Sequence, residues 1–312
     1  MPNPIKWKSK IILAKPEVTY GTDPVPTAAA NAILMTDVEL RPMEGQDVSR
    51  NLERPYLGAQ EEIPVGLYSV LTGSVELVGS GAVATAPGWG PLLRACGAAE
   101  VVTALTNVVY SPVTDNHESI AIYFWMGPTR HVLKGARGTA QITVNAQGIP
   151  VARFTLTGQF ATPGDVARVT PDLTSFQRPQ VATMANTPTF TIGGTAMVLS
   201  QFSFDLGNDI QQRLLIGREE ILIVDRKESI SARVEALPLA TYNPFAIAQA
   251  GTSQGLSLVH GTVAGKIATI SAPTCALKRL TGYEQSQDIA EWPLMLTPKP
   301  TAGNDQWSIT LT

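Results

Sequence analysis

The chain has 312 residues, of which 44% are hydrophobic and only 16% are charged, and its formal net charge is −3. This length accommodates one large domain or two ordinary ones. The slightly acidic balance excludes a protein that grips nucleic-acid phosphates through a basic face, and leaves at most a passive neighbour of DNA. Because charged residues are scarce, we expect large surfaces to be buried, either in a core or against partners.

Targeting and redox signals in the sequence are weak. No run approaches 18 apolar residues, and the opening segment has only a short apolar patch, which predicts a cytosolic product without membrane binding. Cys96 and Cys275 lie far apart in unrelated contexts. We therefore expect two buried thiols, and neither a disulfide framework nor a cysteine-rich zinc site.

Residues 1–30 are predicted to form an extended N-terminal arm. The stretch KPEVTYGTDPVPTAAANAIL (residues 15–34) has no steady hydrophobic period, although it is too apolar for a solvated tail. Pro16, Pro24 and Pro26 restrict the backbone and remove hydrogen-bond donors, so the segment resists both helix formation and indiscriminate strand pairing. A disordered leader is the alternative.

Residues 31–163 read as a first β-rich domain. Ala140, Ile142 and Val144 alternate with polar residues, which is the period-two pattern of a strand with one buried face. One short helix is expected in PGWGPLLRACGAAE, where a proline stands in the first turn and a glycine ends the apolar run. Further strands are expected in residues 33–42, 67–79, 106–113, 119–126 and 138–160.

The stretch 162–189 carries four prolines and shows no clear period, so residues 164–190 are predicted to be an interdomain linker. Residues 191–312 then read as a second β-rich domain with one short helix in YNPFAIAQAG. Its strands are expected in residues 196–207, 219–237, 265–300 and 306–312.

The two β-rich segments repeat the same order of parts. DVELRPMEGQDVSR matches FSFDLGNDIQQR, SVELV matches RVEAL, and GPLLRACG matches NPFAIAQAG. The shared order of strand, long loop, strand and proline-started helix indicates an internal duplication. Similarity by composition alone remains the alternative.

No motif for catalysis or metal binding is found. The three histidines, His117, His131 and His260, lie in turns or at strand ends and in no recognisable motif. Paired glutamates at 61–62 and 219–220 fall in the predicted long loops, where a solvated face is expected rather than a general acid and base. We therefore expect no enzyme, no cofactor and no metal.

The ordered set LAKPEVTYGTDPVPTAAANAIL, DVELRP, YLG, SVELVGSG and APGWGPLLRACG resembles the N-terminal half of the tail tube (major tail) proteins of long-tailed, non-contractile bacteriophages. The resemblance covers roughly residues 10 to 100 by motif and the whole chain by architecture. It implies tandem β-sandwich or barrel-like domains, each with a short flanking helix, in a structural virion protein. Copies of such proteins join into rings, which stack into the tube that delivers DNA into the bacterial host.

The resemblance also implies partners. Because the chain holds two tube domains, a homotrimeric, pseudo-hexameric ring is favoured, and a hexamer is the alternative. Tape-measure, tail terminator and distal tail proteins are expected partners, and genomic DNA is expected to pass through the lumen without specific binding. The protein would be made in the host cytoplasm and end in the phage tail.

In this setting the N-terminal arm is predicted to contact a neighbouring domain or ring through Val18, Tyr20, Pro24 and Pro26. The alternative function is a tandem β-sandwich adhesin or carbohydrate-binding module, which would be a monomer with an aromatic patch. A hydrolase on a β scaffold is a third possibility, and it would need carboxylates or histidines that converge only in space.

Overall fold

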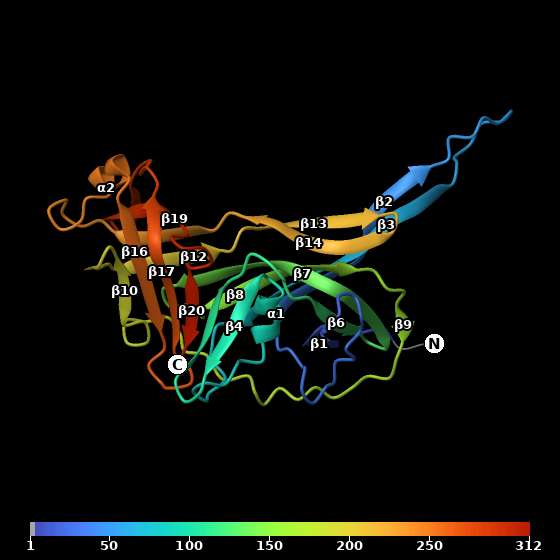
Figure 1. Cartoon of the computed structure of the whole chain (residues 1–312), viewed down its shortest axis with the longest axis horizontal. Helices are drawn as coiled ribbons and strands as arrows, with labels where there is room; N and C mark the ends of the chain where they lie inside the picture. Colours follow the sequence, from blue (N-terminus) through green and yellow to red (C-terminus); the bar gives the residue numbers. More distant parts are fainter. Residues whose placement is uncertain (1–3) are drawn as a thin grey trace.

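The computed structural model describes residues 4–312, which form β-strands, two short helices and connecting loops (Figure 1). The mainly β class predicted from the sequence is confirmed. The elements of the N-terminal half are β1 (Lys10–Pro16), β2 (Thr36–Ser49), β3 (Glu62–Glu76), α1 (Gly90–Arg94), β4 (Ala98–Thr103), β5 (Asn107–Pro112), β6 (Ile120–Met126), β7 (Thr129–Asn145), β8 (Val151–Gln159) and β9 (Gly164–Asp165). Those of the C-terminal half are β10 (Thr189–Ile192), β11 (Thr195–Ala196), β12 (Leu199–Asp205), β13 (Asn208–Leu215), β14 (Arg218–Arg226), β15 (Ser229–Glu235), α2 (Pro244–Ala250), β16 (Ser253–His260), β17 (Ala268–Leu277), β18 (Glu284–Ser286), β19 (Ile289–Pro298) and β20 (Ser308–Leu311).

Both short helices lie where the sequence predicts them, and the second shows why such a helix starts and stops. The Asn243 side chain accepts a hydrogen bond from the Ala246 N–H at 3.0 Å, and Pro244 occupies the first turn. Gly251 ends the helix with a φ of 64°, a conformation that costs glycine little. In α1, Leu92 and Leu93 are buried, whereas in α2 only Pro244 is buried.

One layer of the fold is a continuous antiparallel sheet that crosses both halves. Its strand order is β2-β3-β8-β7-β12-β15-β19-β18. The halves join where β12 pairs with the end of β7, from Gln201 opposite Asn145 to Asp205 opposite Gln141. Within residues 4–312, the two strands that end this order are β2 and β18.

The facing layer is built by strands that bend away from the first. In the N-terminal half the early part of β7 pairs with β6, and β6 pairs with β1. In the C-terminal half β17 pairs with β16, and β16 pairs with β10. The hairpin β4–β5 then joins β20, so this layer also runs from one half into the other. Strands β7 and β17 each take part in both layers.

The bend in β7 depends on Gly135. Its φ is +57°, and a Cβ at this position would lie 2.5 Å from the ring of Tyr20, so a side chain would be excluded by both strain and contact. The register of β7 with β8 shifts between Lys134 and Arg137, as is usual where a bulge turns a strand.

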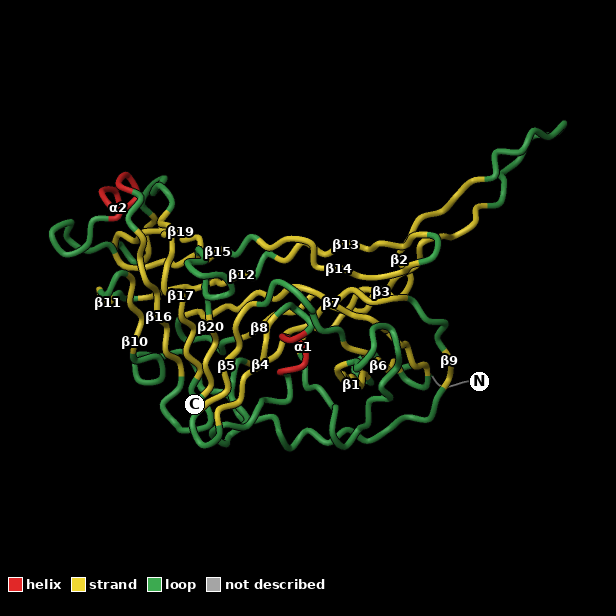
Figure 2. Tube along the Cα trace, in the orientation of Figure 1, coloured by secondary structure: helices red, strands yellow, loops and turns green. Residues whose placement is uncertain are grey.

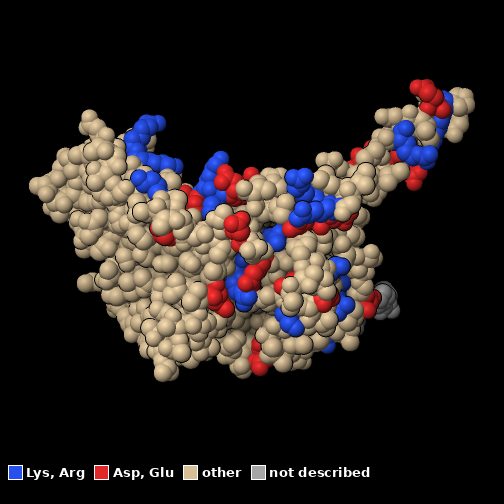
Figure 3. Space-filling view, viewed as in Figure 1, with Lys and Arg blue, Asp and Glu red and all other residues tan. Residues whose placement is uncertain are grey.

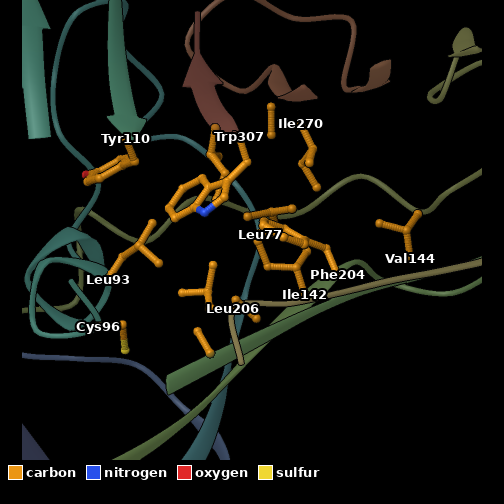
Figure 4. Close-up of a cluster of buried hydrophobic side chains, with 14 of the residues drawn as sticks. Leu77, Leu93, Cys96, Tyr110, Ile142, Val144, Phe204, Leu206, Ile270 and Trp307 are labelled. Atoms are coloured by element: carbon orange, nitrogen blue, oxygen red, sulfur yellow. The ribbon is translucent and has the colours of Figure 1, made fainter. Parts of the chain in front are cut away.

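The main hydrophobic core lies between the layers and includes residues of both halves, and a smaller cluster in the N-terminal half contains Ile11, Leu13, Ala32, Tyr123 and Trp125. Figure 4 shows Leu93 and Tyr110 from the N-terminal half beside Phe204 and Trp307 from the C-terminal half. The rings of Phe204 and Trp307 meet edge to face, with their centroids 5.6 Å apart. The halves are therefore joined by packing as well as by strand pairing.

The connecting segment between the halves follows a long irregular path along one side of the N-terminal half, as Figure 2 shows. It is anchored at intervals by backbone hydrogen bonds, as when the Asp172 N–H donates to the carbonyl of Ala28 and the Ala182 N–H donates to that of Gly148. Residues 10–16, which fall within the predicted N-terminal arm, form β1 in the facing layer.

Candidate assembly surfaces

The hairpin β13–β14 is packed against the N-terminal half of the same chain. It leaves the C-terminal half and lies above β7 in Figure 1. Ile221 on β14 is fully buried there, and Ile223 is nearly so. Asn208 at the base donates from its side-chain amide to the carbonyl of Cys96 at 2.7 Å and to that of Gly138 at 2.9 Å. Through this docked hairpin the C-terminal half packs directly on the N-terminal half.

A buried ion pair anchors the docked hairpin. The Arg137 guanidinium on β7 lies 3.1 Å from the Glu220 carboxylate on β14, and both side chains are about nine-tenths buried. Arg137 also donates to the carbonyl of Ile221 at 2.8 Å and to that of His117 at 2.7 Å. Burial alone would raise the pKa of Glu220, but hydrogen bonds and charge from Arg137 and Arg218 outweigh it and lower that pKa.

Tyr20 completes the anchor from the N-terminal segment. Its ring lies over the Arg137 guanidinium at 4.8 Å, and its hydroxyl accepts a hydrogen bond from the Ile221 N–H at 2.6 Å. Burial raises the pKa of this phenol. A residue predicted to contact another subunit thus has a partner within its own chain.

The other predicted contact residues of the arm differ in exposure. Val18 is 99% exposed, Pro24 is half-buried and Pro26 is buried. They flank a segment whose carboxylate Glu17 accepts hydrogen bonds from Ser119 and from the Gly135 N–H. The segment therefore packs on its own half, while Val18 is presented to the outside.

The hairpin β2–β3 corresponds to β13–β14, but only its base packs on its own chain, where β3 pairs with β8 from Tyr68 to Glu76. It projects away from the body in Figure 1, with residues 50–61 at its end. In its outer part, residues 43–65, the apolar side chains are exposed, Leu57 completely. The others with large exposed fractions are Met43, Val48, Leu52, Tyr56, Ile63 and Val65. A hairpin whose outer part exposes several apolar groups is typical of a surface that binds a partner.

The two hairpins share a short string that sequence reasoning did not use. Residues 61–65 read EEIPV and residues 219–223 read EEILI, so Glu62 matches Glu220 and Ile63 matches Ile221. The expectation of solvated glutamates in loops was wrong for Glu220, which lies on β14 and pairs with Arg137. The repeated EEI string is the signal that could have identified this contact from the sequence.

The far edge of the sheet, at β18, is open and carries exposed groups. Tyr283 and Ile289 are large exposed hydrophobic residues on either side of this strand. Lys278 and Arg279 follow β17 and are exposed as well. The helix α2 lies on this half with Phe245 exposed, and the rings of Phe245 and Tyr283 are 6.3 Å apart. This end of the molecule therefore offers both apolar and basic groups.

The face of the continuous sheet that points away from the core is polar along both halves. The paired residues on it are Glu39 and Thr72 on the first hairpin, Thr155 and Thr139, Arg153 and Gln141, Thr143 and Ser203, and Ser231 with Met295. Hydroxyl and amide groups predominate, and the charges are of both signs. Figure 3 shows blue and red residues interspersed along the upper side of the molecule, with no large single-sign patch in this view.

No arrangement of side chains for catalysis emerges among residues 4–312. His117, His131 and His260 lie apart, and burial lowers the pKa of each. No group of three or more His, Cys, Asp or Glu side chains in this part of the chain could hold a metal ion. Cys96 and Cys275 are both buried and unpaired, as predicted. No helix in the described residues is long and apolar enough to span a membrane.

Comparison with known proteins agrees with this picture. The family model described as "Phage tail tube protein" matches residues 7–309, nearly the whole chain. No curated protein matches the sequence. The resemblance drawn from the motifs in residues 10–100 is thereby confirmed.

Proposed function

The chain belongs to the phage tail tube protein family, and we propose that its copies close into rings that stack into the tube through which phage DNA enters the bacterial host. The observation that carries this proposal is the continuous sheet, which crosses both halves and ends at β2 and β18 in unpaired edges. Open strand edges favour association unless a partner covers them, and ring closure covers all of them at once.

We propose that each chain contributes two tube units, residues 31–163 and 191–312, connected by residues 164–190. The same order of elements in both halves supports this division, with β1 added to the first unit from the preceding segment. Three chains would then supply six units, so the ring is a homotrimer with pseudo-sixfold symmetry. A hexamer of chains is the alternative, and mass measurement distinguishes the two.

The polar face of the continuous sheet is proposed to line the lumen. Its hydroxyl and amide side chains, with charges of both signs, would let a polyanion pass without holding it. A basic lumen would instead bind DNA in a salt-dependent way. The protein would act without catalysis, and its expected partners in the tail are the tape-measure, terminator and distal tail proteins.

Contact between rings is proposed to use the exposed part of the N-terminal segment. Val18 is fully exposed and Pro24 is half-buried, whereas Tyr20 and Pro26 pack within their own chain. Val18 and Pro24 are therefore the residues that a neighbouring ring could contact. Replacing Val18 with Asp should leave rings intact and shorten or abolish stacks. Stacks of normal length from this variant would remove Val18 from the contact.

Electron microscopy of the purified protein in negative stain tests the function directly. Rings or tubes with a central channel are expected, and rotational averaging should show six similar units. Mass photometry of single rings should give three chains. A protein that stays monomeric at high concentration would contradict the proposal and favour a tandem binding module.

A further inference from the structure

Building on the proposed tube, we infer that the contact between neighbouring chains repeats the junction that each chain already contains between its own halves. Residues 282–286 of one copy pair with residues 36–41 of the next, where β2 carries one extra residue in its bulge between Thr36 and Glu39. The β2–β3 hairpin of the second copy lies on the C-terminal half of the first. The partner of both free surfaces is therefore a second copy of this chain, bound in a defined register.

The strand correspondences fix that register. Glu76 on β3 and Glu235 on β15 occupy matching places, since they pair with Val151 on β8 and with Glu291 on β19. Four residues before these glutamates lie Thr72 on β3 and Ser231 on β15. Thr72 pairs with Glu39 and Ser231 pairs with Ser203, so Glu39 corresponds to Ser203. On the other side of the sheet, Val151 pairs with Thr143 and Glu291 pairs with Glu284, so Glu284 corresponds to Thr143.

Within the chain, Ser203 lies directly opposite Thr143. Glu39 of one copy is therefore placed opposite Glu284 of the next, where the Arg233 guanidinium, 3.0 Å from the Glu284 carboxylate, offsets the repulsion between the two carboxylates.

The ends of the pairing agree with this register. Inside the chain, the turn after β7 is held where the Ala146 N–H donates to the carbonyl of Ser200. The exposed Ile289 is the first residue of β19 and directly follows the matching turn between β18 and β19. The matching place beside β2 is an open hollow, lined by the apolar residues Trp7, Ile33, Leu34 and Met35 and also by the charged residues Lys8, Lys10, Asp37 and Glu39. The turn between β18 and β19 of one copy can therefore pack into the hollow beside β2 of the next copy.

The hairpin has a receptor as well. Ile63 and Val65 match Ile221 and Ile223, the residues that are buried when β13–β14 docks on its own chain. Glu62 matches Glu220, whose partner Arg137 lies on β7. The matching stretch of the C-terminal half follows β17 and presents Lys278 and Arg279, so the charges are complementary.

The helix beside that receptor supports the same placement. Residues of α1 are buried in the N-terminal half, but α2 leaves Phe245 exposed next to Tyr283. A hairpin from a neighbouring chain would cover this apolar surface, as β13–β14 covers the N-terminal half.

Disulfide cross-linking tests the register. The double variant Glu39→Cys with Glu284→Cys, oxidised with copper phenanthroline after assembly, should give a covalent ladder of one, two and three chains that ends at the trimer. The matched reference is Thr143→Cys with Ser203→Cys, which should close within single chains at any protein concentration. Glu39→Cys with Leu105→Cys, whose second site is a 95% exposed turn, should give no ladder. The native thiols are buried and should not interfere.

The outcomes separate this inference from the proposed function. Tubes that form but stay uncross-linked, while the reference pair closes, would overturn the register and leave the tube function standing. A wild-type protein that forms neither rings nor tubes would overturn the function itself. If the double variant fails to assemble, Thr36→Cys with Ser286→Cys probes the same strands on the other side of the β2 bulge, because these residues match the in-chain pair Gln201 and Asn145. Tubes of this second variant should give the same ladder, and its absence, or failure of this pair also to assemble, would reject the register.

Discussion

The two long hairpins are built alike, yet one is packed and the other is free. In β13–β14, Ile221 is fully buried and Glu220 pairs with Arg137. In β2–β3, the matching Ile63 is 47% exposed and Glu62 has no such partner in the described chain. The same local sequence thus gives the same local structure, while burial depends on what the rest of the molecule places beneath it. The free hairpin therefore lacks the two contacts that the docked hairpin has, an apolar surface beneath its isoleucine and a cation beside its glutamate.

The largest difference in stability between matched variants of the two hairpins is expected at the buried Arg137–Glu220 ion pair. Arg137→Ala would leave the Glu220 carboxylate in a nearly buried site without its cation, and this should lower the free energy of unfolding by about 3–5 kcal/mol. Arg41→Ala on the free hairpin removes an exposed pair with Glu44 and should change it by less than about 0.5 kcal/mol. Urea unfolding of both variants measures the difference. Equal losses would show that Arg137 is not an anchor.

Next in size is the apolar contact. Ile221→Ala deletes a fully buried side chain and should cost about 2–5 kcal/mol of stability. Ile63→Ala should leave the stability of the monomer within about 0.5 kcal/mol and instead raise the protein concentration at which tubes appear. Thermal unfolding and a light-scattering assay of assembly measure the two effects. An Ile63 variant that assembles like the wild type would show that this hairpin face binds nothing.

A smaller loss is expected at the base of the docked hairpin. Asn208→Ala removes two hydrogen bonds, to the carbonyls of Cys96 and Gly138, and should cost about 1–3 kcal/mol because buried acceptors are left unsatisfied. Gln46→Ala, on the exposed part of β2, is the matched control and should have no measurable effect. Chemical denaturation compares them. A neutral Asn208 variant would mean that water replaces the amide.

The smallest effect is on pH dependence. Burial lowers the pKa of His117, which lies beneath the docked hairpin near Arg226 and Arg137, although its hydrogen bond to the carbonyl of Val113 acts in the opposite direction. The unfolded chain therefore takes up a proton more readily, with a pKa of about 6.5. The contribution of His117 to stability is full above that pH and is lost as the pH falls toward the folded-state pKa.

His117→Gln should accordingly reduce the loss of stability between pH 7 and pH 5, measured by thermal unfolding at each pH. Residues 36–76 contain no histidine, so the free hairpin should add nothing to this dependence. An unchanged pH profile in the variant would place the titrating group elsewhere, with His131 and His260 as the next residues to replace.

Much of the fold could be predicted from local patterns. The alternation at Ala140, Ile142 and Val144 marked the buried face of β7, and a proline followed by a glycine bounded each short helix. The strands β1, β4, β10 and β16 were missed. In the case of β1 the prolines of the surrounding segment made it look irregular. The outer part of β2–β3 was taken for a long loop, since residues exposed on both faces carry no period, whereas β14 falls in the strand predicted over residues 219–237.

The sequence by itself determined the mainly β class, the positions of both helices, the repeated order of parts and the family. Each of these depends on interactions between residues near in the chain or on the order of short strings. Only the tertiary structure decided that β7 pairs with β12, that Glu220 lies beside Arg137 and that Tyr20 packs within its own chain. Such contacts join residues far apart in sequence, and no local pattern specifies which strand edge or which charge a residue will meet.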